Sequence, residues 1–176
     1  SEAQQAAKEI GDMPPAKAKE AVTKLIMVLS NEHDSWSTHY HITQAEAART
    51  LGKIGPDAEN AVTALVNALD YLHPDVRKEA VIALRYLGDE TKLAIPSLAL
   101  LVEKDKVAVV RMEAAKTLGI LGQKAKYALP SLVNALENDK NPYVCKEAAL
   151  AMAKVDPTSK LALDALARSL VDYDEI

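Results

Sequence analysis

A six-residue segment returns four times along this chain at an almost constant spacing, and this spacing constrains the fold more than any other feature. Each copy begins with Glu-Ala and ends with Leu or Met, and the copies start 33, 34 and 34 residues apart. A fixed period of this length indicates a repeat architecture, in which two-helix units stack on their neighbours. The copies are Glu46–Leu51, Glu79–Leu84, Glu113–Leu118 and Glu147–Met152.

A helical pattern surrounds each copy, and we call this expected helix helix A. Val76, Ala80, Leu84 and Leu87 occupy the i, i+4, i+8 and i+11 positions of one helical face, and the other copies repeat this arrangement. Glycine directly after a helix suits a position where a positive φ costs little. The expected stops of helix A are Gly55, Gly88, Gly122 and Asp156.

A second apolar pattern, helix B, follows each helix A and keeps the same period. Pro96 and Pro130 occupy matched positions in it. Because proline is tolerated only in the first turn of a helix, helix B should begin close to them, after a short separate turn. A fainter copy with core positions Val22 and Leu29 precedes the four repeats. The expected core positions of the later B helices include Leu65, Leu98 and Leu132, with Leu163, Leu166, Ala167 and Leu170 in the last one.

These patterns predict an all-α fold, a right-handed α-solenoid of about five helix pairs in a single domain, 1–176. A βαβ alternation does not fit, because no β-branched run of strand length separates the helices. A four-helix bundle would need no fixed interval and would use longer helices. The expected parts are a degenerate first repeat 1–30, an insertion loop 31–42, and repeats 43–72, 73–106, 107–140 and 141–171.

The chain resembles HEAT repeats of the short bacterial kind, also called phycobilisome-lyase-type repeats, in the segments Asp75–Gly88, Val110–Gly122 and Leu51–Asp57. The resemblance implies stacked helix pairs, but it does not specify a function, since this repeat serves many tasks. It also implies a polar ladder between repeats, built from an Asp and an Arg before helix A. Only Asp75 and Arg77 occur together, so the ladder is expected to be incomplete. Arg111 lacks its Asp, and Cys145 replaces the Arg.

Composition narrows the classes of function. The formal net charge of −4 and the pI near 5.6 argue against a nucleic-acid partner, which needs a basic face. No apolar run is long enough to insert into a membrane. We therefore expect a soluble chain, with a cytoplasmic location favoured and export after removal of a signal also compatible. The single Cys145 is expected to be a half-buried filler more than an activated thiol.

The face of helix B opposite its core is the first candidate binding site. In the arrays that this chain resembles, helix B lines the concave side. Asn67 and Asn134 could bond an extended peptide backbone, and Leu100 would offer an apolar contact between them. Acids near helix C-termini cost about 0.3–1 kcal/mol each, so a row of them favours a basic partner. The alternative is a solvated face without a partner. The predicted residues are Asn67, Asp70, Leu100, Glu103, Asn134, Glu137 and Arg168.

The insertion before the second helix pair is the second candidate. It is rich in aromatic and imidazole groups, which suit contact with a partner, although packing of the loop against the array is the simpler interpretation. A metal is a third option, but the spacing lacks the paired-Cys or His-Glu-x-x-His patterns of zinc sites. The candidate contact residues are Trp36, His39, Tyr40 and His41.

The sequence therefore predicts a non-catalytic interaction or scaffold module that binds a protein or peptide and holds no cofactor or metal. No phosphate-binding loop, nucleophile elbow or catalytic triad pattern occurs. The alternative is a lyase-like or metal-dependent enzyme subunit that uses the loop 33–41. No polar cap follows the last helix, which fits a chain that belongs to a longer protein or to a larger complex.

Overall fold

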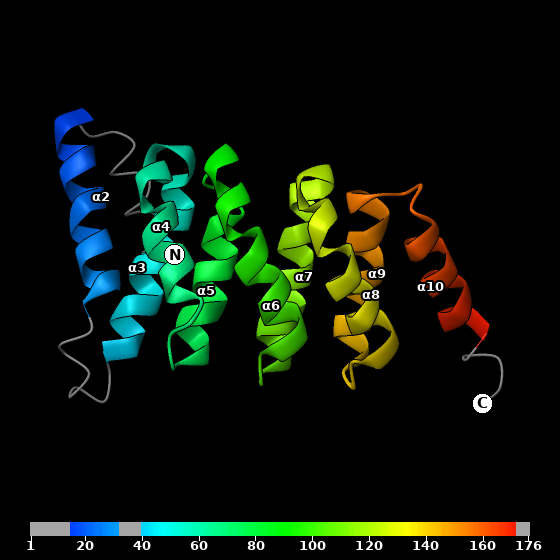
Figure 1. Ribbon diagram of the computed structural model, residues 1–176. Helices are drawn as coiled ribbons and strands as arrows, with labels where there is room; N and C mark the ends of the chain where they lie inside the picture. The colour runs from blue at the N-terminus through cyan, green and yellow to red at the C-terminus, as the bar shows by residue number, and fades with distance from the viewer. Residues whose placement is uncertain (1–14, 32–39, 172–176) are drawn as a thin grey trace. The chain divides into compact units, whose positions relative to one another are not determined.

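The computed structural model describes residues 15–31 and 40–171, and every regular element in these two ranges is a helix (Figure 1). The all-α prediction is confirmed, and no strand occurs in the described part of the chain. Two compact units can be distinguished, Ser1–Ala94 and Ile95–Ile176, which we call unit 1 and unit 2. Their boundary lies inside the predicted repeat 73–106.

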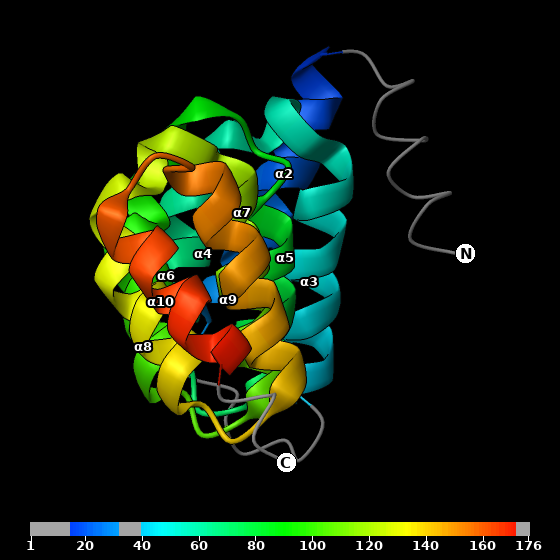
Figure 2. The same cartoon turned by 90° about the vertical axis from the view of Figure 1, so that its right-hand side faces the viewer.

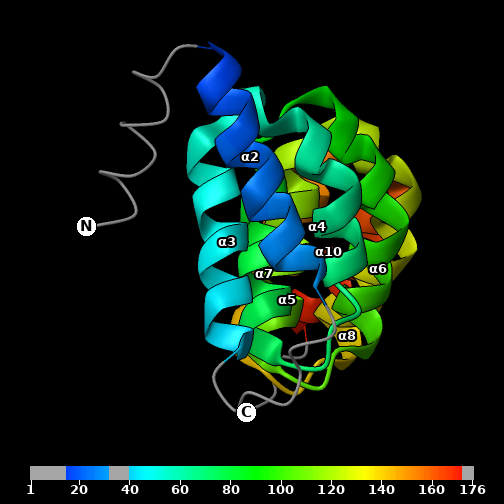
Figure 3. The same cartoon turned by 90° about the vertical axis from the view of Figure 1, so that its left-hand side faces the viewer.

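Unit 1 contains two A helices and two B helices. The A helices pack on each other, and α2 lies against α3 and α4 (Figure 3). The first B helix belongs to the predicted degenerate repeat, whose helix A falls outside the described residues. The elements are α2 (Pro15–Ser30), α3 (Tyr40–Ile54), η1 (Gly55–Ala61), α4 (Val62–Ala68), α5 (Pro74–Leu84) and η2 (Asp89–Ala94).

Unit 2 contains three B helices, α6, α8 and α10, and two A helices, α7 and α9. In Figure 2, α7 and α9 lie side by side, and α8 contacts α10. The predicted short turn before helix B is the 3₁₀ helix η3, and both α6 and α8 start one residue before their proline. The elements are α6 (Ile95–Lys104), α7 (Ala108–Leu121), η3 (Gly122–Ala128), α8 (Leu129–Asn138), α9 (Pro142–Val155) and α10 (Lys160–Val171).

The core of each unit is built from the predicted apolar positions. Leu65 and Leu84 in unit 1, and Leu118 and Leu132 in unit 2, are completely buried. Full burial of such a side chain stabilises the folded state by about 1.5–3 kcal/mol, so a single buried leucine on each helix already stabilises the stack. Gly55 and Gly122 directly follow α3 and α7 and have positive φ, as expected for helix stops. Gly88 also has positive φ, but α5 already ends at Leu84, so the predicted stop at Gly88 is wrong.

The last helix differs from the prediction. Leu163 is 54% exposed and Ala167 is exposed, whereas Ala162 and Ala165 are buried. A 3₁₀ segment precedes α8, but α10 follows a short turn and begins with the bond from the Leu163 N–H to the Ser159 carbonyl. Because a 3₁₀ helix turns further per residue than an α-helix, its replacement rotates the helix and changes which residues face inward.

The start of α3 also corrects the sequence-based boundary of the insertion. Residues 40–42 are helical, so Tyr40 and His41 belong to α3 and not to the predicted loop 31–42. The Tyr40 hydroxyl donates to the Val28 carbonyl at 2.8 Å, which ties α3 to α2. Trp36 and His39 lie outside the described residues.

Glycine sets the distance between neighbouring A helices in each unit. A Cβ added to Gly52 would lie 2.6 Å from the Ala83 Cα, and one added to Gly119 would lie 2.9 Å from the Ala151 Cα. Both neighbours are backbone atoms, so a side chain at either glycine would force the two helices apart.

We expect Gly52→Ala to lower the free energy of unfolding by about 1–3 kcal/mol through overpacking. This loss should outweigh the gain in helix propensity of about 1 kcal/mol. Urea unfolding followed by circular dichroism measures the change. Ala153→Gly, at the matching but exposed position of α9, is the control and should cost only the propensity difference. A stabilised Gly52→Ala variant would contradict the close approach.

Candidate functional site

Five of the predicted groove residues lie on consecutive B helices of unit 2. Leu100 and Glu103 are exposed on α6, Asn134 and Glu137 on α8, and Arg168 on α10. These helices pack as neighbours, α6 against α8 and α8 against α10. We call this surface the helix-B face of unit 2. Asn67 and Asp70 are exposed at the matching positions of unit 1.

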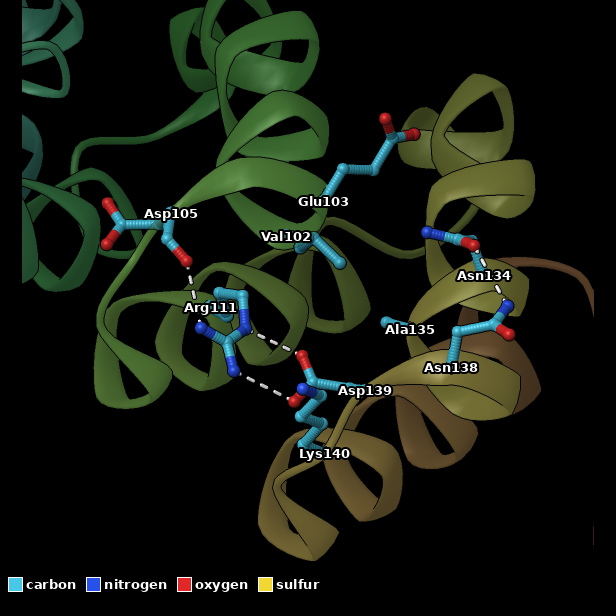
Figure 4. Close-up of a pocket in the computed structure, with 9 residues that line it drawn as sticks. All are labelled: Val102, Glu103, Asp105, Arg111, Asn134, Ala135, Asn138, Asp139 and Lys140. Atoms are coloured by element: carbon cyan, nitrogen blue, oxygen red, sulfur yellow. Dashed lines mark hydrogen bonds and ion pairs between the residues drawn. The ribbon is translucent and has the colours of Figure 1, made fainter.

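A hollow of about 230 Å³ opens on this face, where α6 and α8 end (Figure 4). Glu103 and Asn134, two of the residues predicted for the groove, line it. The turns that follow the two helices supply the other polar groups, which the sequence had not singled out as a site. The lining residues are Val102, Glu103, Asp105, Arg111, Asn134, Ala135, Asn138, Asp139 and Lys140.

A partly buried ion pair forms one side of the hollow. Arg111 on α7 bonds both carboxylate oxygens of Asp139, with Nε to Oδ2 at 2.6 Å and Nη2 to Oδ1 at 2.8 Å. The side chains are only 16% and 7% exposed. Arg111 also donates to the Asp105 carbonyl at 2.8 Å, and the Asn141 N–H donates to the Asp139 carboxylate at 2.9 Å. The two turns are therefore held in place relative to α7.

This pair corrects the expectation that the polar ladder is interrupted at Arg111. The acid is Asp139, in the turn after α8. It is not a residue two positions before the arginine, as Asp75 is for Arg77. Asp105 and Asp139 stand one repeat apart, 34 residues, so their spacing was a readable signal. Bidentate pairing of a guanidinium with a carboxylate fixes both distance and orientation, which makes the hollow a preformed feature.

The charges of this pair are stable because each partner favours the ionised form of the other. Burial raises the pKa of Asp139, but bonds from Arg111 and from the Asn141 N–H outweigh burial and leave this pKa below its ordinary value. The bond to Asp139 raises the pKa of Arg111.

Cys145 holds the position in α9 that Arg111 holds in α7. Its thiol donates to the Asp139 carbonyl at 3.3 Å, as Arg111 donates to the Asp105 carbonyl. Burial, and then the negative charge of Asp139, raise the pKa of the Cys145 thiol. A half-buried thiol with a raised pKa is a poor nucleophile, so the residue has the properties of a filler.

The rim of the hollow is polar and partly paired. The Ser131 hydroxyl donates to Glu103 Oε1 at 2.5 Å, and Asn138 Nδ2 donates to Asn134 Oδ1 at 3.0 Å. These bonds leave the amide nitrogen of Asn134 and the amide oxygen of Asn138 without a partner among the described residues. The rim thus presents a donor, an acceptor and a carboxylate within one small surface (Figure 4).

The predicted row of acids is reduced by an ion pair. Arg168 on α10 donates to Glu137 Oε1 through Nε at 2.8 Å and also through Nη2. Both side chains are accessible to water, so the pair contributes at most about 1 kcal/mol. It nevertheless neutralises Glu137, and Glu103 remains as the unneutralised acid of the predicted row in unit 2.

The second predicted site is described only in part. His41 lies on α3, where its ring stacks on that of His73, with 3.7 Å between the ring centroids. His73 caps α5, because its Nδ1 accepts from the Asp75 N–H at 3.3 Å. Among residues 15–31 and 40–171, no group of three or more His, Cys, Asp or Glu side chains is arranged to hold a metal ion.

Comparison with known families defines the class of protein. The model of HEAT repeats matches residues 37–119 and 95–176, so this chain belongs to the HEAT repeat family. Comparison with curated proteins gives no match. Within the described part of the chain, no helix has both the length and the hydropathy needed to cross a bilayer.

Solved structures support the same α-solenoid fold at low sequence identity. A designed armadillo repeat protein in complex with the peptide (KR)4 matches at 21% identity with a TM-score of 0.58, over 96% of this chain and 88% of that chain. An engineered protein matches at 23% identity with a TM-score of 0.54, over 96% of this chain and 85% of that chain. The complex of CpcE and CpcF of phycocyanin lyase from Nostoc sp. PCC7120 matches at 21% identity with a TM-score of 0.58, over 85% of this chain and 97% of that chain.

We expect acid to weaken unit 2 through Asp139. A carboxylate whose pKa is depressed by folding stabilises the native state above its unfolded pKa, near 3.8, and this stability is lost as the pH falls through the folded value. Asp139→Asn should lower the free energy of unfolding at pH 7 by about 1–3 kcal/mol. It should also make this free energy depend less on pH below pH 4.

The matched control is Glu137→Gln, which removes an accessible ion pair from the same helix. It should cost less than about 1 kcal/mol. Urea unfolding between pH 3 and pH 7 compares the three proteins. Equal losses in both variants would argue against a structural role for the Arg111–Asp139 pair.

Proposed function

We propose that this protein is a non-catalytic interaction module and that the helix-B face of unit 2 binds an extended segment of another protein. The observation that carries the proposal is the hollow that Glu103, Asn134 and Asn138 line where α6 and α8 end. Its side formed by Arg111 and Asp139 is locked, while its rim keeps unsatisfied amide groups and a carboxylate. A rigid surface with unmet hydrogen-bonding capacity loses little entropy when it binds a ligand.

Three kinds of contact fit this surface. The amide groups of Asn134 and Asn138 suit the alternating donors and acceptors of a peptide backbone. Leu100 is 54% exposed and offers an apolar contact. Glu103, held by Ser131, suits a lysine or arginine side chain of the partner. A designed repeat protein of similar fold was solved with the peptide (KR)4, which gives a basic, extended probe for this surface.

We expect a labelled (KR)4 peptide to bind, and Glu103→Lys to weaken its Kd about tenfold or more, because one attractive contact becomes repulsive. Asn134→Ala should weaken the Kd as well by removing the backbone contact. Fluorescence anisotropy measures both. Glu59→Lys, an equal charge reversal at an exposed site on η1, is the control for the net charge. Unchanged affinity in both groove variants would remove this face as the binding site.

The alternative function is a lyase-like or metal-dependent enzyme subunit that uses the loop 33–41. The phycocyanin lyase structure supports it only through the shared fold, since the identity is 21%. We favour the binding module because Cys145 is a weak nucleophile and the groups on the helix-B face suit recognition more than proton transfer.

Elemental analysis of the purified protein distinguishes the two functions. A binding module should contain no stoichiometric zinc, copper or iron, and His41→Ala should leave the metal content unchanged. Stoichiometric metal that is lost in a His39→Ala/His41→Ala variant would favour the enzyme subunit.

A further inference from the structure

The opposite side of unit 2 carries an unusual set of exposed apolar residues. Helices α7 and α9 pack closely through Gly119 and Ala151, so their outward sides form one continuous surface. Single exposed apolar side chains are ordinary, but a group of them on two adjacent helices indicates an interaction site. The group consists of Val109, Ile120, Tyr143 and Leu150, which are between 41% and 67% exposed.

Lysines alternate with these apolar residues along each helix and across the pair. In the repeat of 34 residues, Lys116 corresponds to Leu150 and Ile120 corresponds to Lys154, so a basic position on one helix is an apolar position on the other. Lys146 lies between Tyr143 and Leu150 on α9. We call this surface the outer face of α7 and α9. It consists of the four apolar residues together with Lys116, Lys146 and Lys154.

The exposed layer of this face is positive although the whole chain is acidic. The three lysines are exposed and form no ion pair or hydrogen bond with another described residue. The two acids on the same helices, Glu113 and Glu147, are only half exposed, so they reduce the positive potential without forming the outermost layer. A local field of this kind attracts carboxylates at short range even when the net charge is −4.

Unit 1 repeats the composition around its own glycine contact. A hollow of about 370 Å³ is lined there by Arg49, Lys53, Ile82 and Tyr86, with Gly52 and Ala83 between them. When the repeats are aligned, these four residues occupy, in the same order, the positions of Lys116, Ile120, Leu150 and Lys154 in unit 2. Each unit therefore surrounds its glycine–alanine contact with two basic and two large apolar side chains. In unit 1, Arg49 is already bonded to Glu79, so unit 2 offers the stronger attraction for an anion.

We propose that the outer face of α7 and α9 binds an acidic, apolar segment of a partner protein, in the manner of an amphipathic helix rich in glutamate and leucine. The leucines of the segment would cover Ile120, Leu150 and Tyr143, and its carboxylates would reach the lysines between them. Attraction between the carboxylates of the segment and the lysines would orient the segment and speed its association. The apolar contacts would supply most of the affinity. This interaction is separate from binding on the helix-B face.

The test uses a fluorescein-labelled peptide of glutamate and leucine that forms an amphipathic helix, with the full chain and fluorescence anisotropy. We expect saturable binding that weakens as salt increases. Ile120→Ser/Leu150→Ser and Lys116→Glu/Lys154→Glu should each raise the Kd about tenfold or more. A peptide with lysine in place of glutamate should not compete. Circular dichroism verifies that the variants remain folded.

Matched controls lie on α10. Leu163→Ser removes a leucine of similar exposure, and Lys160→Glu reverses an exposed charge, and neither should change the Kd. Absence of binding by the unaltered chain, or an unchanged Kd in both double variants, would overturn the proposal. So would binding to phosphatidylserine vesicles that the two double variants abolish while the peptide does not compete, because the ligand would then be an anionic membrane. Groove variants such as Glu103→Lys should leave this peptide bound, which keeps this test separate from the proposed function.

Discussion

The contact between a glycine on one A helix and an alanine on the next determines the geometry of each unit. With no side chain at Gly119, α7 and α9 approach until their backbones meet at Ala151. The B helices are connected to the A helices by short turns, so the separation of α7 and α9 also affects where α8 lies. The reach from Arg111 on α7 to Asp139, just before α9, depends on the same separation. Gly52 and Ala83 give unit 1 an equivalent spacing.

Close packing of the A helices gives the two sides of unit 2 different chemistry. At the helix-B face, Arg111 pairs with Asp139 and Arg168 with Glu137, while the amide groups of Asn134 and Asn138 and the Glu103 carboxylate are exposed. On the outer face of α7 and α9, three lysines lie among apolar side chains and have no ion-pair partner within residues 15–31 and 40–171. The two surfaces differ in charge although the buried rows of the repeats are alike, because exposed residues vary independently of the buried ones.

Most helices and core residues were predictable because burial recurs with a fixed period. Leu65, Leu84, Leu118 and Leu132 are all buried where the period placed them. The departures occur where the period is broken. Helix α10 lacks the preceding 3₁₀ turn, so it is rotated and buries alanines in place of Leu163. Tyr40 lies in α3, and its hydroxyl donates to the Val28 carbonyl of α2, a contact between residues 12 positions apart that no periodic pattern contains.

The class of fold, the two-helix unit, the glycine stops after α3 and α7 and the exposed rows could be predicted from the sequence, because each of these depends on neighbours within one repeat. Only the tertiary structure decided which charges remain available. The partners Arg111 and Asp139 are 28 residues apart, and Glu137 and Arg168 are 31 apart. Whether such groups meet depends on the separation and rotation of whole helices. Spacing along a chain can place a residue on a face, but it cannot tell whether a neighbouring repeat has already neutralised its charge.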